Sequence, residues 1–101
     1  MKVIITEDKR NRLAINVIED DYPNLKKMVF PTHDGVFISD KGMFKMLYNS
    51  RVKTLYVLNE IWDLIRDMFS YDNDEVADLL LDWGNKKFGF RAKKCSRVEQ
   101  I

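Results

Sequence analysis

The chain has 101 residues, of which 46% are hydrophobic and 33% are charged, with two prolines and four glycines. This composition is typical of a single globular domain, 1–101, with its own core, and it excludes an intrinsically disordered chain. The single cysteine excludes a disulfide scaffold, and a net charge of +1 excludes a protein whose whole surface binds nucleic acid or membrane.

The N-terminal part predicts a short strand followed by a helix. Residues 3–5 favour a strand that stops at Thr6, a residue type that often caps helices. Apolar residues then recur at helical spacing over 13–18, and Pro23 would end the helix. The same apolar residues also alternate, which leaves a hairpin turning at 8–11 as the alternative, although that turn lacks glycine.

The middle of the chain, 25–58, changes to strand-like runs separated by turn residues. The segments 31–35, 39–42 and 49–50 contain the Pro, Gly, Asn, Asp and Ser residues typical of turns. This pattern predicts three or four antiparallel strands in a meander. The last run, 52–58, is apolar at both sets of alternating positions, which predicts a central strand buried on both faces.

Two amphipathic helices are predicted after this sheet. Asn59 is expected to cap the first helix, whose apolar stripe includes Trp62. Asp72, with Glu75 three residues later, predicts a capping box at the start of the second helix. The apolar positions of the second helix leave only a narrow polar edge, so this helix is expected to be mostly buried.

The C-terminal part completes the predicted fold. Gly84 is expected to weaken the second helix near its end, Gly89 to stop it, and residues 90–98 to form a strand at a sheet edge. Together the elements predict an α+β fold, an antiparallel sheet of four to six strands with two or three helices packed on one face.

Charge is distributed unevenly along the second half of the chain. Asn59–Trp83 contains eight acidic residues and one arginine, a net charge of −7, whereas Lys86–Arg97 contains six basic residues and no acid. We interpret this as two segments that partly neutralise each other across the fold. The alternative is a basic patch that binds a partner, and its candidate residues are Lys86, Lys87, Arg91, Lys93 and Lys94.

The basic patch also suggests a nucleic-acid alternative. Phe88 and Phe90 interleave with its lysines, as in single-strand binders that combine base stacking with attraction to the phosphate backbone. The competing interpretation is a strand whose phenylalanines pack on the sheet while its cations face water. The acidic helices next to the patch oppose nucleic-acid binding, because they would repel phosphate.

A possible protein interface is predicted on the second helix. Leu79, Leu81 and Trp83 form an apolar surface that exceeds what one sheet is expected to cover. Because monomers seldom expose a large contiguous apolar patch, these residues indicate contact with another chain, either a second copy or a different protein.

No group of residues predicts catalysis, a metal site or a cofactor. His33 is the single histidine and lies in a turn, and the acidic loop 72–75 lacks the spacing of a calcium loop. Cys95 lies among basic residues that would lower its pKa, but a half-buried strand position is the favoured interpretation. The glycines form no phosphate-binding pattern. The chain is therefore expected not to be an enzyme.

Short motifs towards both ends of the chain support a resemblance. They are VIITE at 3–7 followed by RL at 12–13, LYV at 55–57, IWD at 61–63, MF at 68–69, LLDW at 80–83 and KFG at 87–89. These motifs resemble those of small uncharacterised proteins of tailed phages and marine metagenomes. The resemblance implies a phage context and a layout of strand, helix, sheet and helix pair, and it assigns no catalytic residue.

The expected function is that of a non-catalytic, phage-encoded protein-binding component. The favoured form is a virion accessory or adaptor subunit, and the alternative is a small inhibitor of a host protein that acts in anti-defence. The expected location is the virion or the host cytoplasm. No membrane association is expected, since the opening apolar run is interrupted at Glu7, too early for a signal peptide or a membrane span.

Overall fold

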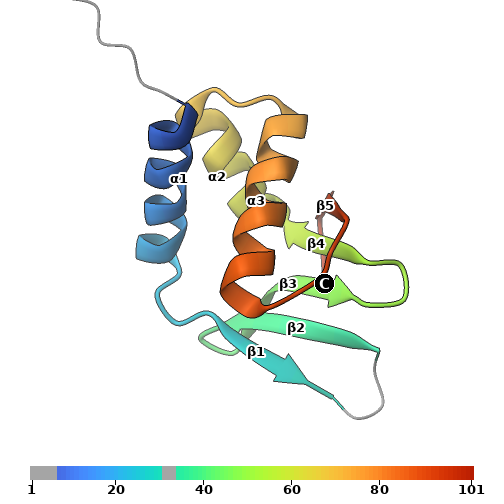
Figure 1. Ribbon diagram of the computed structural model, residues 1–101. Helices are drawn as coiled ribbons and strands as arrows, with labels where there is room; N and C mark the ends of the chain where they lie inside the picture. Colours follow the sequence, from blue (N-terminus) through green and yellow to red (C-terminus); the bar gives the residue numbers. More distant parts are fainter. Residues whose placement is uncertain (1–6, 31–33) are drawn as a thin grey trace, which may run out of the picture.

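The structure is a computed structural model that describes residues 7–30 and 34–101 (Figure 1). Within these residues the helices are α1 (Glu7–Asp21), α2 (Asn59–Phe69) and α3 (Asn73–Phe88), and the strands are β1 (Lys26–Val29), β2 (Gly35–Asp40), β3 (Met43–Asn49), β4 (Thr54–Leu58) and β5 (Lys94–Val98). The strand predicted at 3–5 and the turn position of His33 lie outside the described residues.

The strands form one sheet in the order β1-β2-β3-β4-β5. The first four strands are an antiparallel meander, as predicted. β5 is the predicted edge strand, but it begins at Lys94 and not at residue 90, because the Asn85 side chain of α3 binds the backbone N–H and carbonyl oxygen of Ala92. β5 differs from the expectation in running parallel to β4. The reason is the helix pair α2–α3, which connects these two strands and returns the chain to the end of the sheet where β4 began. The α+β fold class is confirmed.

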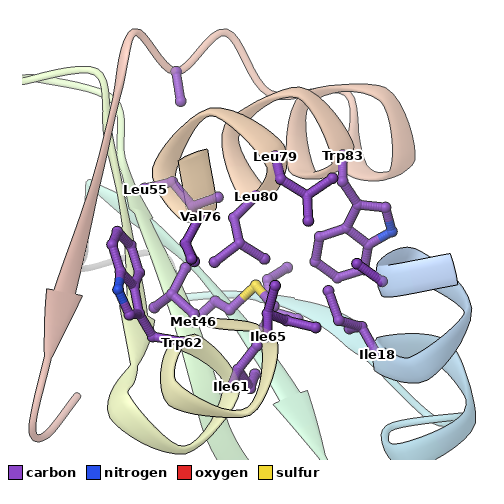
Figure 2. Close-up of a cluster of buried hydrophobic side chains, with 14 of the residues drawn as sticks. Ile18, Met46, Leu55, Ile61, Trp62, Ile65, Val76, Leu79, Leu80 and Trp83 are labelled. Carbon is purple, nitrogen blue, oxygen red and sulfur yellow. The ribbon is translucent and has the colours of Figure 1, made fainter. Parts of the chain in front are cut away.

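All three helices lie on one side of the sheet (Figure 1). Between the two layers is a core to which every helix contributes, including the fully buried Ile18 of α1, Ile65 of α2 and Leu80 of α3. From the sheet, Met46 and Leu55 point into the same cluster (Figure 2). Each fully buried side chain of this type contributes about 1.5–3 kcal/mol of transfer free energy, so this covered face holds the fold together.

The helix predicted in the N-terminal part is confirmed as α1, and the alternative hairpin is wrong for residues 13–18. Ala14 and Ile18, four residues apart, are both fully buried, because a helix brings this spacing to one face. Beside them, Arg10 of α1 forms a partly exposed ion pair with Glu75 of α3 at 2.6 Å, which connects the two helices.

The ends of α3 confirm two predictions. Asp72 and Glu75 form the predicted capping box, with Asp72 Oδ1 accepting from Glu75 N at 2.8 Å and Glu75 Oε1 accepting from Asp72 N at 3.1 Å. Gly89 ends the helix in the left-handed conformation at φ 73°. Gly84 lies inside the helix, four residues before its end, and the structure adds a packing reason for a glycine there, because an added Cβ would approach Leu55 Cδ2 to 2.8 Å.

The start of α2 differs from the prediction. The N-cap position is Leu58, without a side-chain cap, and Asn59 is the first helical residue. The helix therefore begins directly at the end of β4, one residue earlier than expected, and its apolar stripe, with Ile61 and Trp62, still faces the core.

A β-bulge shapes one end of the covered face. The register between β2 and β3 shifts at Ile38/Ser39, so Lys45 is an extra residue on β3. Its ammonium group reaches Glu60 of α2 at 2.6 Å.

Burial, together with the charge of Glu60 and a hydrogen bond to it, raises the pKa of the neighbouring Tyr22 to about 12. The Tyr22 hydroxyl therefore stays protonated to a higher pH than that of an ordinary tyrosine.

Candidate protein-binding face

The side of the sheet opposite the helices, here called the open face, is not covered by any helix of the described chain. Its centre is a row of four residues that are direct cross-strand neighbours on β1, β2, β3 and β4: Met28, Phe37, Leu47 and Tyr56. Alternation along each strand explains this row, since the residues on either side of Leu47, Met46 and Tyr48, point into the core.

Three phenylalanines form an aromatic cluster at the β1–β3 side of the open face. The rings of Phe37 and Phe44 lie 4.7 Å apart and are tilted by 36°. The ring of Phe30 makes T-shaped contacts with both, with centroids 5.4 Å from Phe37 and 6.2 Å from Phe44. These geometries are favourable for aromatic pairs, and the rings consequently occupy part of one another's faces.

Apolar area on the open face remains accessible to solvent. Met28 and Phe30 are exposed, while Phe37, Leu47 and Tyr56 are half-buried. The open-face positions of the five described strands contain no acidic residue; their polar members are small or amide side chains and two lysines. Contiguous apolar surface rimmed by polar residues is typical of interaction sites.

Four lysines stand at the borders of the open face, and together they are here called the basic rim. Lys26 lies on the edge strand β1 and Lys94 on the opposite edge strand β5, while Lys41 and Lys53 lie in the β2–β3 and β3–β4 turns. All four are exposed. Within the described residues, none of the four forms an ion pair with an acid.

Cations that contact the helical layer behave differently. Most are paired with a carboxylate: Arg10 with Glu75, Lys45 with Glu60, Arg66 with Asp63 and Asp67, Lys86 with Asp82, Lys87 with Glu19, and Arg97 with Asp63.

The charge of the two layers is correspondingly opposite. The three helices contain 12 acidic and six basic residues, whereas 22–58 and 89–101, which form the sheet and its connections, contain three acidic and ten basic residues.

The structure corrects the predicted interface on α3. Leu79 and Trp83 are 6% and 4% exposed, so they are inside the protein's own core and face no partner. Figure 2 shows the reason, since Trp83 points towards Ile18 of α1. The prediction assumed that only the sheet buries the apolar residues of α3, whereas α1 packs on this part of α3 as well. Leu81 alone of the three is half-buried at the surface.

The predicted basic patch is divided between two parts of the molecule. Lys86 and Lys87 form ion pairs at the end of α3, while Lys94 projects on the open face and belongs to the basic rim. Arg91 borders a cavity of about 350 Å³ on the covered side of β1 and β2. Lys93 is exposed, and its backbone N–H donates a hydrogen bond of 2.7 Å to the carbonyl oxygen of Lys53.

Phe88 and Phe90 do not belong to a surface track. They are 8% and 9% exposed, and Phe90 stacks on Tyr48 with ring centroids 4.6 Å apart. Their rings face the core, as in the competing interpretation of a segment whose phenylalanines pack on the sheet. Base stacking on these two residues, which the nucleic-acid alternative required, is therefore excluded in this conformation.

Cys95 is not an activated thiol. Burial raises its pKa to about 12, which is the opposite of the lowering expected from the lysines near it in the sequence. The side chain points to the covered side of β5, towards the core, so the charged thiolate would have to form in an apolar environment. Among the described residues, no group of three or more His, Cys, Asp and Glu side chains is placed to hold a metal ion.

The open face is the candidate site that the sequence reasoning did not find. Residues 52–58 were expected to be buried on both sides because they are apolar at both sets of alternating positions. The central place of β4 is confirmed, but Tyr56 and Leu58 are only half-buried, since all the helices lie on the other side. The available signal was the same double apolar pattern in β2 and β3, at Phe37 and Leu47.

Comparisons with protein-family models, with curated proteins and with solved structures find no match to this chain. No helix within 7–30 and 34–101 combines the length and apolar character that a membrane span requires.

Proposed function

We propose that this protein is a non-catalytic binding component that uses the open face of its sheet to bind another protein. The observation behind the proposal is the uncovered apolar row Met28, Phe37, Leu47 and Tyr56. Aromatic residues and methionine are enriched in the centres of protein interfaces, where charged residues are depleted, and polar and charged residues form the surrounding rim. The open face has this composition and this arrangement.

The geometry of the rings favours a protein partner over a single-stranded nucleic acid. Base stacking needs an aromatic ring with an accessible face. In the aromatic cluster the rings of Phe30, Phe37 and Phe44 pack against one another, which reduces the ring surface available for stacking. Of the other central residues, Met28 and Leu47 offer no π surface, which leaves Tyr56 as the single ring of the row outside the aromatic cluster. Such a surface is better suited to packing against side chains than to stacking with bases.

A virion accessory or adaptor subunit is the form of this function that we propose. The resemblance of the end motifs to small phage-encoded proteins supports the phage context, and an apolar binding face bordered by lysines supports a structural task. A mass-spectrometric inventory of purified particles tests this location. Stoichiometric presence in particles is the expected result, whereas presence only in infected cells would favour the inhibitor alternative.

Site-specific photo-crosslinking tests the binding face itself. A benzophenone amino acid is introduced at Tyr56, on the open face, or at Asp78, an exposed position of α3, and the protein is irradiated in the cells in which it is made. We expect a covalent adduct with a protein from position 56 and little or none from position 78. Equal yields at both positions, or no adduct at position 56, would contradict the proposal.

A further inference from the structure

The lysines of the basic rim lack the partners that cations on the other side of the molecule have. Six cations that contact the helical layer are paired with carboxylates, whereas Lys26, Lys41, Lys53 and Lys94 form no such pair within the described residues. They lie on both edge strands and in two of the turns that connect the strands, so they surround the apolar row. The open face is thus an apolar centre bordered by four unpaired lysines, with one paired cation, Arg51 with Asp34 at 3.4 Å, in the β3–β4 turn.

We infer that the partner bound by the open face is a protein surface with an apolar centre and acidic residues around it. This inference rests on the proposed function and adds the chemistry of the partner. An acidic border would place carboxylates opposite the four lysines when the two apolar centres come together. Charge complementarity of this kind increases the association rate and excludes wrong partners, because like charges opposed across an interface are unfavourable.

The same charges argue against a second copy packed sheet against sheet. In a two-fold symmetric pair of open faces, β1 lies opposite either β1 or β5 of the other copy. Such a dimer would bring eight rim lysines to one interface, and the open-face positions of the described strands provide no acid to compensate them. The apolar row alone would favour such a dimer, but the basic rim opposes it.

Charge reversal of the rim tests the inference. One variant carries Lys26→Glu, Lys41→Glu, Lys53→Glu and Lys94→Glu, and a second carries glutamine at the same four positions. A third variant, with Arg12→Glu and Lys86→Glu on the helical layer, changes the total charge by the same amount as the glutamine variant and is its matched control. Because the rim lysines are exposed and unpaired, and the Lys86–Asp82 pair of the control is at the surface, all variants should unfold at nearly the wild-type urea concentration.

The readout is the crosslink formed in cells from the benzophenone at position 56. We expect the glutamate variant to reduce the adduct about tenfold or more, the glutamine variant to reduce it less, and the control to leave it unchanged. Sequencing of the crosslinked partner peptide should show Asp and Glu residues close to the apolar residues that react. The inference requires both results: loss of the adduct on charge reversal of the rim, and acidic residues in the partner peptide.

The other outcomes separate failure of this inference from failure of the proposed function. A protein adduct that survives charge reversal, or a partner peptide without acidic residues, would overturn the inference and leave the binding face intact. A crosslink from position 56 to β1 or β5 of a second copy would also overturn the inference about an acidic partner and leave the binding face intact. Tight binding of the purified protein to a thymidine oligonucleotide of about 20 bases at ~150 mM salt, lost with Tyr56→Ala, would overturn both.

Discussion

The two faces of the sheet have similar apolar composition but different surroundings. On the covered face, Met46, Leu55 and Val57 are completely buried beneath three helices. On the open face, Leu47 and Tyr56 occupy neighbouring positions on the same strands and remain partly in contact with water. An apolar side chain can therefore stabilise the fold or provide a binding surface, depending on what covers it. The difference implies that mutations on the two faces should separate stability from binding.

The largest loss of stability is expected on the covered face at Trp83. Trp83→Ala removes an indole that is 4% exposed and lies between α1 and α3, and it should lower the free energy of unfolding by about 3–5 kcal/mol. That loss approaches the whole stability of many small domains, so the variant should be largely unfolded. Urea denaturation followed by circular dichroism measures it. A transition close to that of wild type would show that the covered face is not the main source of stability.

A matched pair of leucines compares the faces directly. Leu55→Ala, on the covered side of β4, should cost about 2–5 kcal/mol, because Leu55 is completely buried. Leu47→Ala, on the open side of β3, should cost about 1 kcal/mol or less, since Leu47 already contacts water. In the folded protein the effect on crosslink yield should be reversed, with Leu47→Ala lowering the yield more than Leu55→Ala. Equal destabilisation by the two substitutions would mean that the open face is covered in solution.

A smaller effect is expected from the capping box of α3. Asp72→Ala removes the side chain that accepts from Glu75 N and should lower the free energy of unfolding by about 1 kcal/mol. Asp72→Asn is the control, because asparagine is an equally good cap and should retain most of the stability. Binding through the open face should be unchanged in both variants. Loss of the crosslink in a folded Asp72→Ala variant would show that the helical layer takes part in binding.

The smallest effect concerns the ion pair that attaches β5 to α2. Arg97 donates two hydrogen bonds to Asp63, at 3.0 and 2.9 Å, and these bonds lower the pKa of Asp63 below its ordinary value of 3.8. A carboxylate with a lowered pKa stabilises the fold above its unfolded pKa. Its contribution therefore disappears as the pH falls through the lower, folded value.

NMR titration of the Asp63 carboxylate between about pH 2 and 6 measures this pKa directly. Arg97→Gln should return it towards 3.8 and should weaken the acid dependence of unfolding slightly, because the pair is at the surface. An unchanged pKa in the variant would show that β5 is not held to α2 by this contact.

Much of the fold could be predicted because it depends on local patterns. The capping box at Asp72 and the stop at Gly89 are each determined by a few consecutive residues, and the sequence predicted both. The apolar spacing that defines α1 was also sufficient to favour a helix over a hairpin. The parallel orientation of β5 could not be predicted, since it depends on how α2 and α3 pack together before the chain returns to the sheet.

The binding face was harder to predict because burial is a property of the whole fold. The apolar positions of α3 indicated an interface at Leu79 and Trp83, but α1, more than 50 residues away in sequence, packs against them. Conversely, nothing in the local pattern of β3 distinguishes Leu47, which remains accessible, from Met46, which is buried. Only the placement of three helices on one side separates them.

The edge strand β1 has a consequence for how this protein behaves at high concentration. An accessible sheet face next to an unpaired strand edge would ordinarily allow copies to add strand by strand into a fibre. β1 has four residues, all exposed, and two of them are lysines. A short, positively charged edge is a poor template for another strand, so association through the open face should produce discrete complexes and not continuous sheets.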